Sequence, residues 1–183
     1  IIEYYKDEKI DISIKPSQLG LLISPVSCQK HLNEITTLAK QYGQTVRLDM
    51  EDSRVTELTT GLAVYLNNKF GNVGVAIQAN LHRTKQDLKH LLENNVSVRL
   101  VKGAYKESSD ISLKSKKKIK SAFFNYAKMF LSNEPNRAAI GTHDKTLLKQ
   151  VREIAPTKFF DYEFLYGIRR DIQKQLKDKG ENV

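Results

Sequence analysis

The chain has 183 residues and a mass of 20.9 kDa, which predicts one domain over residues 1–183. Hydrophobic residues make up 40% and charged residues 28%, with 9 glycines and 4 prolines, so disordered, collagenous and low-complexity classes are excluded. No apolar run reaches the roughly 18 residues that span a bilayer, and the first ten residues lack the apolar core of a signal peptide. We therefore expect a cytoplasmic protein.

The net charge is +9, from 30 Lys plus Arg against 21 Asp plus Glu. Such an excess serves nucleic acid, an anionic membrane face or an anionic ligand equally well. Much of it comes from lysines at 114–120, which are not interleaved with aromatic residues as in a platform that stacks single strands. We therefore predict no nucleic-acid partner. The single cysteine, Cys28, fits a reducing compartment and is expected to be buried.

In chain order, short apolar or alternating runs predict strands, and longer amphipathic stretches predict the helices that follow them. The strands are expected at 10–15, 45–49, 73–78, 97–102, 138–142 and 159–164. The helices are expected at 28–42, 54–70, 85–93, 116–131, 145–154 and 170–179. Strand and helix in alternation indicate parallel strands joined by right-handed crossovers.

Polar residues close five successive strands, and ligands of parallel α/β folds bind beyond the carboxyl ends of strands. These residues are Lys15, Asp49 with Glu51, Gln78, Lys102, and Thr142 with His143 and Asp144. Because there is no GxGxxG, GxxxxGKS/T or GxSxG motif, a (β/α)8 barrel is favoured over an open dinucleotide-binding sheet. With about six β/α units against the usual eight, we expect the TIM-barrel type to be incomplete.

Arg99 is the residue that most needs a partner, because an arginine on a barrel strand is costly without an anion. Asp49 could supply that anion through an ordinary ion pair. After the strand, Gly103 and Ala104 allow a backbone to come close to a ligand. His143 suits hydrogen bonding to a cofactor, and the four histidines show no zinc spacing, so no metal site is predicted.

Six segments, in this order and at these separations, resemble the catalytic barrel of the proline dehydrogenase family. They are DISIKPSQLG at 11–20, VRLDMED at 46–52, VGVAIQANLHRT at 73–84, VRLVKGAYKE at 98–107, GTHD at 141–144 and YEFLYGIR at 162–169. The resemblance implies a distorted (β/α)8 barrel that holds FAD non-covalently. It also implies an oxidoreductase of proline catabolism that oxidises L-proline to Δ1-pyrroline-5-carboxylate by hydride transfer to FAD and passes electrons to a membrane quinone.

The resemblance also implies roles for individual residues. Arg99 is expected at the reactive edge of the flavin, and Asp49 is expected to order the site by charge pairing. The cofactor contacts implied are Met50, Gln78, Arg99, Lys102, Gly103, Ala104, Thr142 and His143. The substrate contacts implied are Lys15 at the proline carboxylate, with Tyr105 and Leu165 beside the proline ring.

The family's first strand, and the last strand and helix that supply a Tyr and an Arg-Arg clamp for the proline carboxylate, have no counterpart here. Arg169 and Arg170 follow the wrong strand to be that clamp. We therefore expect a fragment of a longer protein, inactive or very weak by itself, with peripheral contact at the inner membrane face as a further expectation. Oligomeric state is left open.

Two alternatives remain from the residues alone. One is a Schiff-base lyase or aldolase that uses Lys15 or Lys102, which requires a lysine in an apolar pocket. The other is a truncated, inactive barrel that serves as an interaction domain through its unpaired strand edges. Flavin absorbance of the purified protein separates both from a flavoenzyme.

Overall fold

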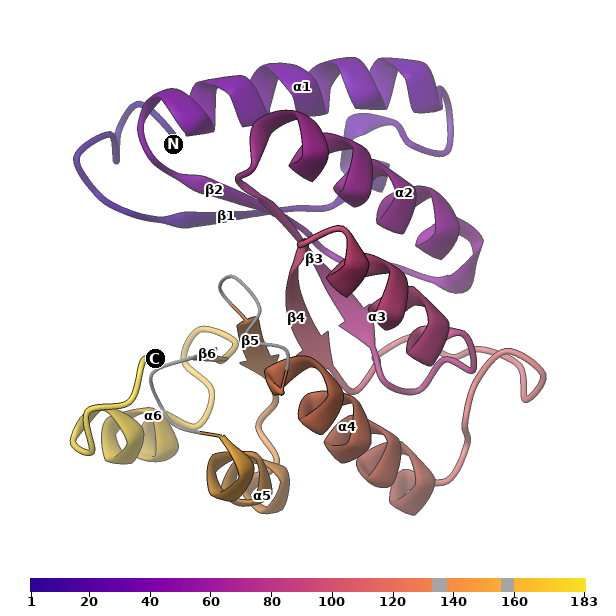
Figure 1. Cartoon of the computed structure of the whole chain (residues 1–183), viewed down its shortest axis with the longest axis vertical. Helices are drawn as coiled ribbons and strands as arrows, with labels where there is room; N and C mark the ends of the chain where they lie inside the picture. The colour runs from indigo at the N-terminus through magenta and orange to yellow at the C-terminus, as the bar shows by residue number, and fades with distance from the viewer. Residues whose placement is uncertain (133–137, 156–159) are drawn as a thin grey trace. The chain divides into compact units, whose positions relative to one another are not determined.

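The computed structural model describes residues 1–132, 138–155 and 160–183, which form two compact units. The first unit comprises Ile1–Ala76 with Glu93–Val96, and the second comprises Ile77–Leu92 with Ser97–Val183. Strands and helices alternate along both units (Figure 1). Among the described helices, none is both long and apolar enough to cross a membrane.

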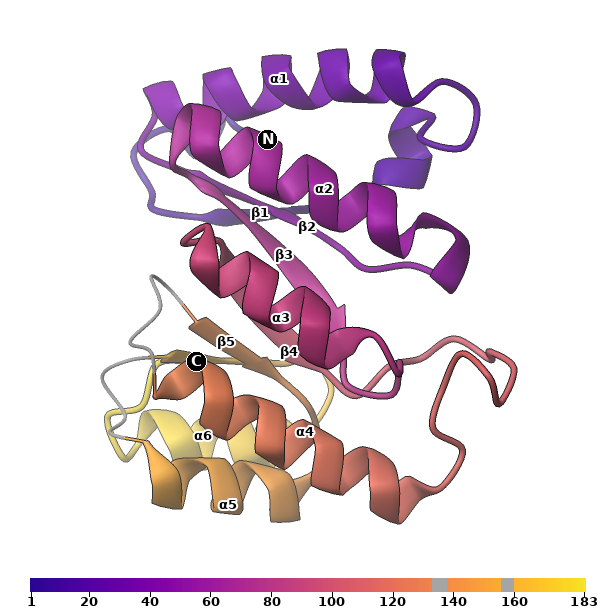
Figure 2. The ribbon, with the colours of Figure 1, turned by 45° about the vertical axis from the view of Figure 1, so that its right-hand side comes forward.

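The first unit is a parallel sheet covered by helices. Its elements are β1 (Asp11–Ile14), the 3-10 helix η1 (Pro16–Leu19), α1 (Pro25–Gln41), β2 (Thr45–Leu48), α2 (Ser53–Phe70) and most of β3 (Val73–Gln78). β2 pairs in parallel with β1 and with β3. α1 and α2 lie side by side on one face of these strands (Figure 2). Every residue of β3 is buried, as expected of a parallel strand covered on both faces.

Local sequence explains where the helices of this unit begin and end. α1 starts three residues before the predicted position, because the Ser24 side chain accepts a hydrogen bond from the Ser27 N–H and Pro25 fits the first helical position. α2 follows the N-cap Asp52 and ends at Gly71, whose φ of 76° suits glycine. Cys28 lies on the core face of α1 and is fully buried, which confirms that prediction.

The second unit repeats the same alternation. Its elements are α3 (Thr84–Glu93), β4 (Ser97–Val101), α4 (Lys116–Leu131), β5 (Ala138–Gly141), α5 (Lys145–Ile154), β6 (Phe160–Glu163) and α6 (Arg170–Lys177). β5 pairs in parallel with β4 and with β6. α4 and α5 pack against each other, and the buried stripe of α4 is Phe123, Ala127 and Phe130.

The observed strands lie within the predicted ones, and most are shorter by a residue at one end or both. Differences of this size are usual at the ends of secondary-structure elements. Phe159, predicted to begin the sixth strand, lies outside the described residues. The last helix, predicted near 170–179, is α6, which ends at Lys177 before the chain turns through Gly180 at a φ of 76°. The 3-10 helix η1 was not predicted.

Candidate functional site

An ion pair between Arg99 and Glu163 lies at the carboxyl end of the second unit's sheet. Arg99 comes from β4 and Glu163 is the last residue of β6, and the Arg99 Nε contacts the Glu163 carboxylate. The guanidinium side chain is 16% exposed and the carboxylate 27%. The anion that we expected beside Arg99 is thus present, supplied by Glu163. An Arg99–Asp49 pair stays a prediction.

Lys102 and Lys120 converge on one carboxylate, that of Asp144. The Asp144 Oδ2 lies 2.9 Å from the Lys120 Nζ and 3.4 Å from the Lys102 Nζ. Its other oxygen accepts hydrogen bonds from the Thr146 and Leu147 N–H groups and so caps α5. Burial acts to raise the pKa of Asp144, but the Lys120 hydrogen bond, the Lys102 charge and the cap together hold that pKa below its usual value.

The backbone after β4 makes two close approaches to the end of β3. The Gln78 side chain is buried, and its Oε1 accepts a hydrogen bond from the Ala104 N–H at 3.3 Å. Gly103 has a φ of 105°, and a Cβ on it would overlap the Asn80 carboxamide. Only glycine fits there without strain. The predicted cofactor residues Gln78, Gly103 and Ala104 are therefore brought together.

The segment after β5 is tied to the segment after β6. The Thr142 side chain is buried and its Oγ1 accepts a hydrogen bond from the Asp144 N–H at 3.3 Å. The His143 Nε2 accepts a hydrogen bond from the Leu165 N–H at 3.1 Å, which requires the proton on Nδ1. This bond fixes the backbone that carries Leu165, whose side chain is 69% exposed.

Three predicted residues lie in the first unit, where a carboxylate fixes the turn after β1. The Glu51 Oε1 accepts a hydrogen bond from the Ser17 N–H at 2.9 Å, and its Oε2 accepts from the Ser17 hydroxyl. Lys15 is exposed, Asp49 is half-buried and Met50 is buried. The Asp49 N–H donates to the Ile14 carbonyl at 2.8 Å, so Lys15 and Asp49 follow paired ends of β1 and β2.

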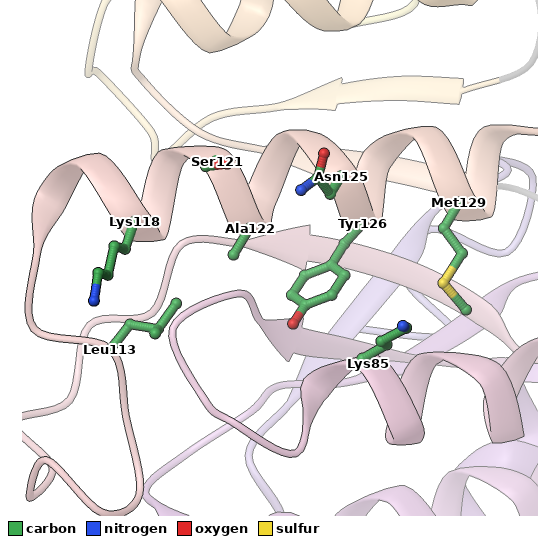
Figure 3. Close-up of a pocket in the computed structure, with 8 residues that line it drawn as sticks. All are labelled: Lys85, Leu113, Lys118, Ser121, Ala122, Asn125, Tyr126 and Met129. Atoms are coloured by element: carbon green, nitrogen blue, oxygen red, sulfur yellow. The ribbon is translucent and has the colours of Figure 1, made fainter.

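The second unit also contains a pocket of about 450 Å³ between α4 and the start of α3. Figure 3 shows the Tyr126 ring projecting from α4 toward α3, with Lys85 opposite it. Leu113, Lys118 and Met129 are among the other lining residues, and burial raises the pKa of Tyr126. None of the eight lining residues is a predicted site residue.

Glu163, Asp144, Lys120 and Asn80 belong to the cluster but were not among the predicted site residues. Glu163 could have been found, since it closes the sixth predicted strand as the other polar residues close theirs. Lys120 lies in a run of lysines, and the sequence alone does not indicate which of them contributes to the site.

Parallel strands with cationic and polar side chains beyond their carboxyl ends define a class of protein, the α/β barrel type, and the prediction of that fold class is confirmed. The chain superposes on the proline utilization A protein (PutA) of Bdellovibrio bacteriovorus inactivated by N-propargylglycine with a TM-score of 0.82. The two are 26% identical, and the match covers 93% of this chain and 21% of that chain.

The family model for proline dehydrogenase matches residues 3–183, so the chain belongs to the proline dehydrogenase family. It is 34% identical over 175 residues to proline dehydrogenase 1 of Bacillus subtilis subsp. natto, a match that covers 93% of this chain and 58% of that relative. It is 32% identical over 158 residues to a proline dehydrogenase of Deinococcus radiodurans, covering 81% of this chain and 50% of the relative. The chain thus spans little more than half the length of these relatives.

Proposed function

We propose that the complete natural protein oxidises L-proline to Δ1-pyrroline-5-carboxylate with FAD as a non-covalent cofactor. The observation that carries the proposal is the second unit's cluster of Arg99, Lys102 and Gly103 at the strand ends, in a chain of the proline dehydrogenase family. A quinone as the electron acceptor, a cytoplasmic location and peripheral contact at the inner membrane face are further proposals from the family resemblance.

The residues present fit a flavin dinucleotide by their chemistry. A pyrophosphate needs cations and backbone N–H groups, and Lys102 and the backbone of Gly103 supply them at one turn. The buried Gln78 carboxamide can present its N–H groups to ring heteroatoms while its oxygen is held by Ala104. Met50, Thr142 and His143 complete the set that we assign to the cofactor.

When bound, FAD supplies the two-electron acceptor that takes a hydride from proline. Arg99 would stabilise the negative charge that develops on the acceptor, because its guanidinium stays charged and sits largely away from water. Lys15 would bind the proline carboxylate, with Asp49 balancing its charge. Tyr105 and Leu165, both partly exposed beside the strand ends, would pack on the proline ring.

The geometry argues against a Schiff-base enzyme that uses Lys102. A Schiff-base lysine works in an apolar pocket where its charge is disfavoured. The Lys102 Nζ instead lies 3.4 Å from the Asp144 carboxylate, and the side chain is 39% exposed. Lys102 therefore lacks the apolar surroundings that such a lysine needs.

The test is an absorbance spectrum of the complete natural protein, followed by anaerobic addition of L-proline. We expect a flavin spectrum that proline bleaches, and FAD that heat denaturation releases into solution. Lys102→Gln should weaken FAD binding about tenfold to a hundredfold, as loss of a charge-assisted hydrogen bond does. Lys106→Gln, which removes an exposed lysine four residues further on, is the matched control and should bind FAD normally.

A protein that stays colourless after incubation with FAD would overturn the proposal. Trapping of a carbonyl substrate on Lys102 by borohydride would favour the lyase instead.

A further inference from the structure

The ion pair of Arg99 with Glu163 crosses an intervening strand. β4 and β6 both pair with β5, so the Arg99 side chain must pass over β5 to reach Glu163. In the register of the sheet, Val101, Gly141 and Glu163 lie in one row, and Arg99 sits two residues before Val101. The pair is therefore a diagonal contact.

Gly141 marks where Arg99 crosses β5. A Cβ at Gly141 would lie 3.5 Å from the Arg99 Cγ and 3.6 Å from the Arg99 Cδ, which is ordinary van der Waals contact, and 2.9 Å from the Val101 Cγ1, which is too close. The aliphatic stem of Arg99 therefore passes beside Gly141 on its way to Glu163.

Glu163 is itself held in place on two sides. Its backbone pairs with Gly141 at the end of β6, and two residues later the Leu165 N–H donates to His143. A carboxylate carried by a fixed backbone can orient its partner, because a charge-assisted contact offsets the rotamer entropy of a long arginine side chain.

From this geometry we infer that Glu163 is a positioning residue that orients Arg99 for hydride transfer. The inference rests on the proposed function, in which Arg99 faces the reactive edge of the flavin. Glu163 then acts on the reaction only through Arg99. Its removal would free the guanidinium to take other orientations, and misplacement by about 1 Å can cost about a hundredfold in rate.

A double-mutant cycle on the complete natural protein tests this inference, with Glu163→Gln and Arg99→Met alone and together. The readout is the single-turnover rate at which proline bleaches the bound flavin. We expect Glu163→Gln to slow bleaching about tenfold to a hundredfold, and to add less than about a twofold effect once Arg99 is replaced. Glu163→Asp, which keeps the charge but shortens the side chain, should also slow bleaching.

The matched control is Asp161→Asn. Asp161 lies on β6 two residues before Glu163 and faces the same side of the strand. Its substitution removes one negative charge, as Glu163→Gln does. The bleaching rate of Asp161→Asn should stay within about twofold of that of the unsubstituted protein, as expected of a carboxylate outside the Arg99–Glu163 pair.

A second readout does not depend on turnover. The Arg99 Nε–H group should give a nuclear magnetic resonance signal that exchanges slowly with water, assigned by its loss in Arg99→Met. We expect Glu163→Gln to speed this exchange and Asp161→Asn to leave it unchanged.

The outcomes separate the two claims. Suppose that the unsubstituted protein binds FAD and is bleached by proline. If Glu163→Gln then bleaches at the normal rate, or slows bleaching by the same factor with and without Arg99→Met, the role of Glu163 is overturned and the proposed function stands. If proline does not bleach the unsubstituted protein, the proposed function falls and this inference falls with it.

Discussion

The Nε of Arg99 contacts the carboxylate of Glu163 across β5, and the aliphatic stem of Arg99 passes beside Gly141. A Cβ at position 141 would be in ordinary contact with that stem but too close to the Val101 Cγ1. Glycine at this position of β5 therefore serves the packing of Val101 next to the strand that the ion pair crosses.

We predict that Gly141→Ala destabilises the protein. The new methyl group would lie 2.9 Å from the Val101 Cγ1, so neighbours must shift, and such overpacking costs about 1 to 3 kcal/mol. Urea unfolding followed by circular dichroism measures the loss. The control is Gly61→Ala in α2, where nothing lies within 4 Å and alanine should stabilise the helix by about 0.5 to 1 kcal/mol. Equal stability of Gly141→Ala and the unsubstituted protein would contradict the prediction.

Gly103→Ala should be more damaging, because it combines backbone strain with a clash. The φ of 105° is outside the regions that L-residues occupy, at a cost of about 1 to 3 kcal/mol, and the methyl group would overlap the Asn80 carboxamide. We expect lower stability in urea and FAD binding weakened at least tenfold, an estimate from the close backbone approach.

Two further variants separate the causes of the Gly103→Ala defect. Gly43→Ala has a φ of 65° and open space, so it should show the modest cost of a left-handed alanine alone, about 1 kcal/mol. Asn80→Ala removes the overlapping carboxamide, so the double variant with Gly103→Ala should recover part of the lost stability. No recovery in the double variant would show that the clash is not the cause.

Asp144→Asn should make stability less sensitive to acid. Because the folded-state pKa of Asp144 lies below the ordinary 3.8, its carboxylate adds stability above about pH 4, and this contribution disappears as the pH falls through the folded value. Asparagine still caps a helix, so the substitution removes mainly the pairing with Lys102 and Lys120. We expect a loss of about 1 kcal/mol at pH 7 that shrinks toward zero at pH 2.

Urea unfolding at pH 7, 5, 3 and 2 measures the Asp144 contribution. Asp7→Asn, at an exposed aspartate of the first unit, is the control and should change stability little at any pH. A difference between Asp144→Asn and the unsubstituted protein that stays constant over this range would rule out the charge as its source.

The strands could be predicted because each alternation or apolar run is a local property of the sequence. β3 shows this best, since the run at 73–78 has the bounds of the strand and every residue in it is buried. The start of α1 was missed, although Ser24 and Pro25 are ordinary start signals, because the apolar periodicity begins only at Cys28. The turn η1 was missed because its anchor, Glu51, lies 34 residues away in the sequence.

The partners of the site residues were harder to predict than the residues themselves. Lys102, Gln78 and His143 each stand at a strand end and were predicted as site residues for that reason. The pairing of Arg99 with Glu163 depends on the register of three strands, which no local pattern encodes. Likewise, Lys120 is distinguished from its neighbouring lysines only by its distance to Asp144.

Cys28 offers a last prediction, because it is the one cysteine of the sequence and any thiol signal belongs to it. Its side chain is fully buried and donates to the Pro16 carbonyl at 3.4 Å. Burial, with the nearby Glu51 charge, raises the pKa of the Cys28 thiol above 9.0, so the reactive thiolate is scarcer than in an exposed cysteine at pH 8. A disulfide reagent should therefore react about a hundredfold more slowly with the native protein than with the protein in urea, since reaction must await local opening. Native and unfolded protein reacting at the same rate would show that the turn after β1 opens freely.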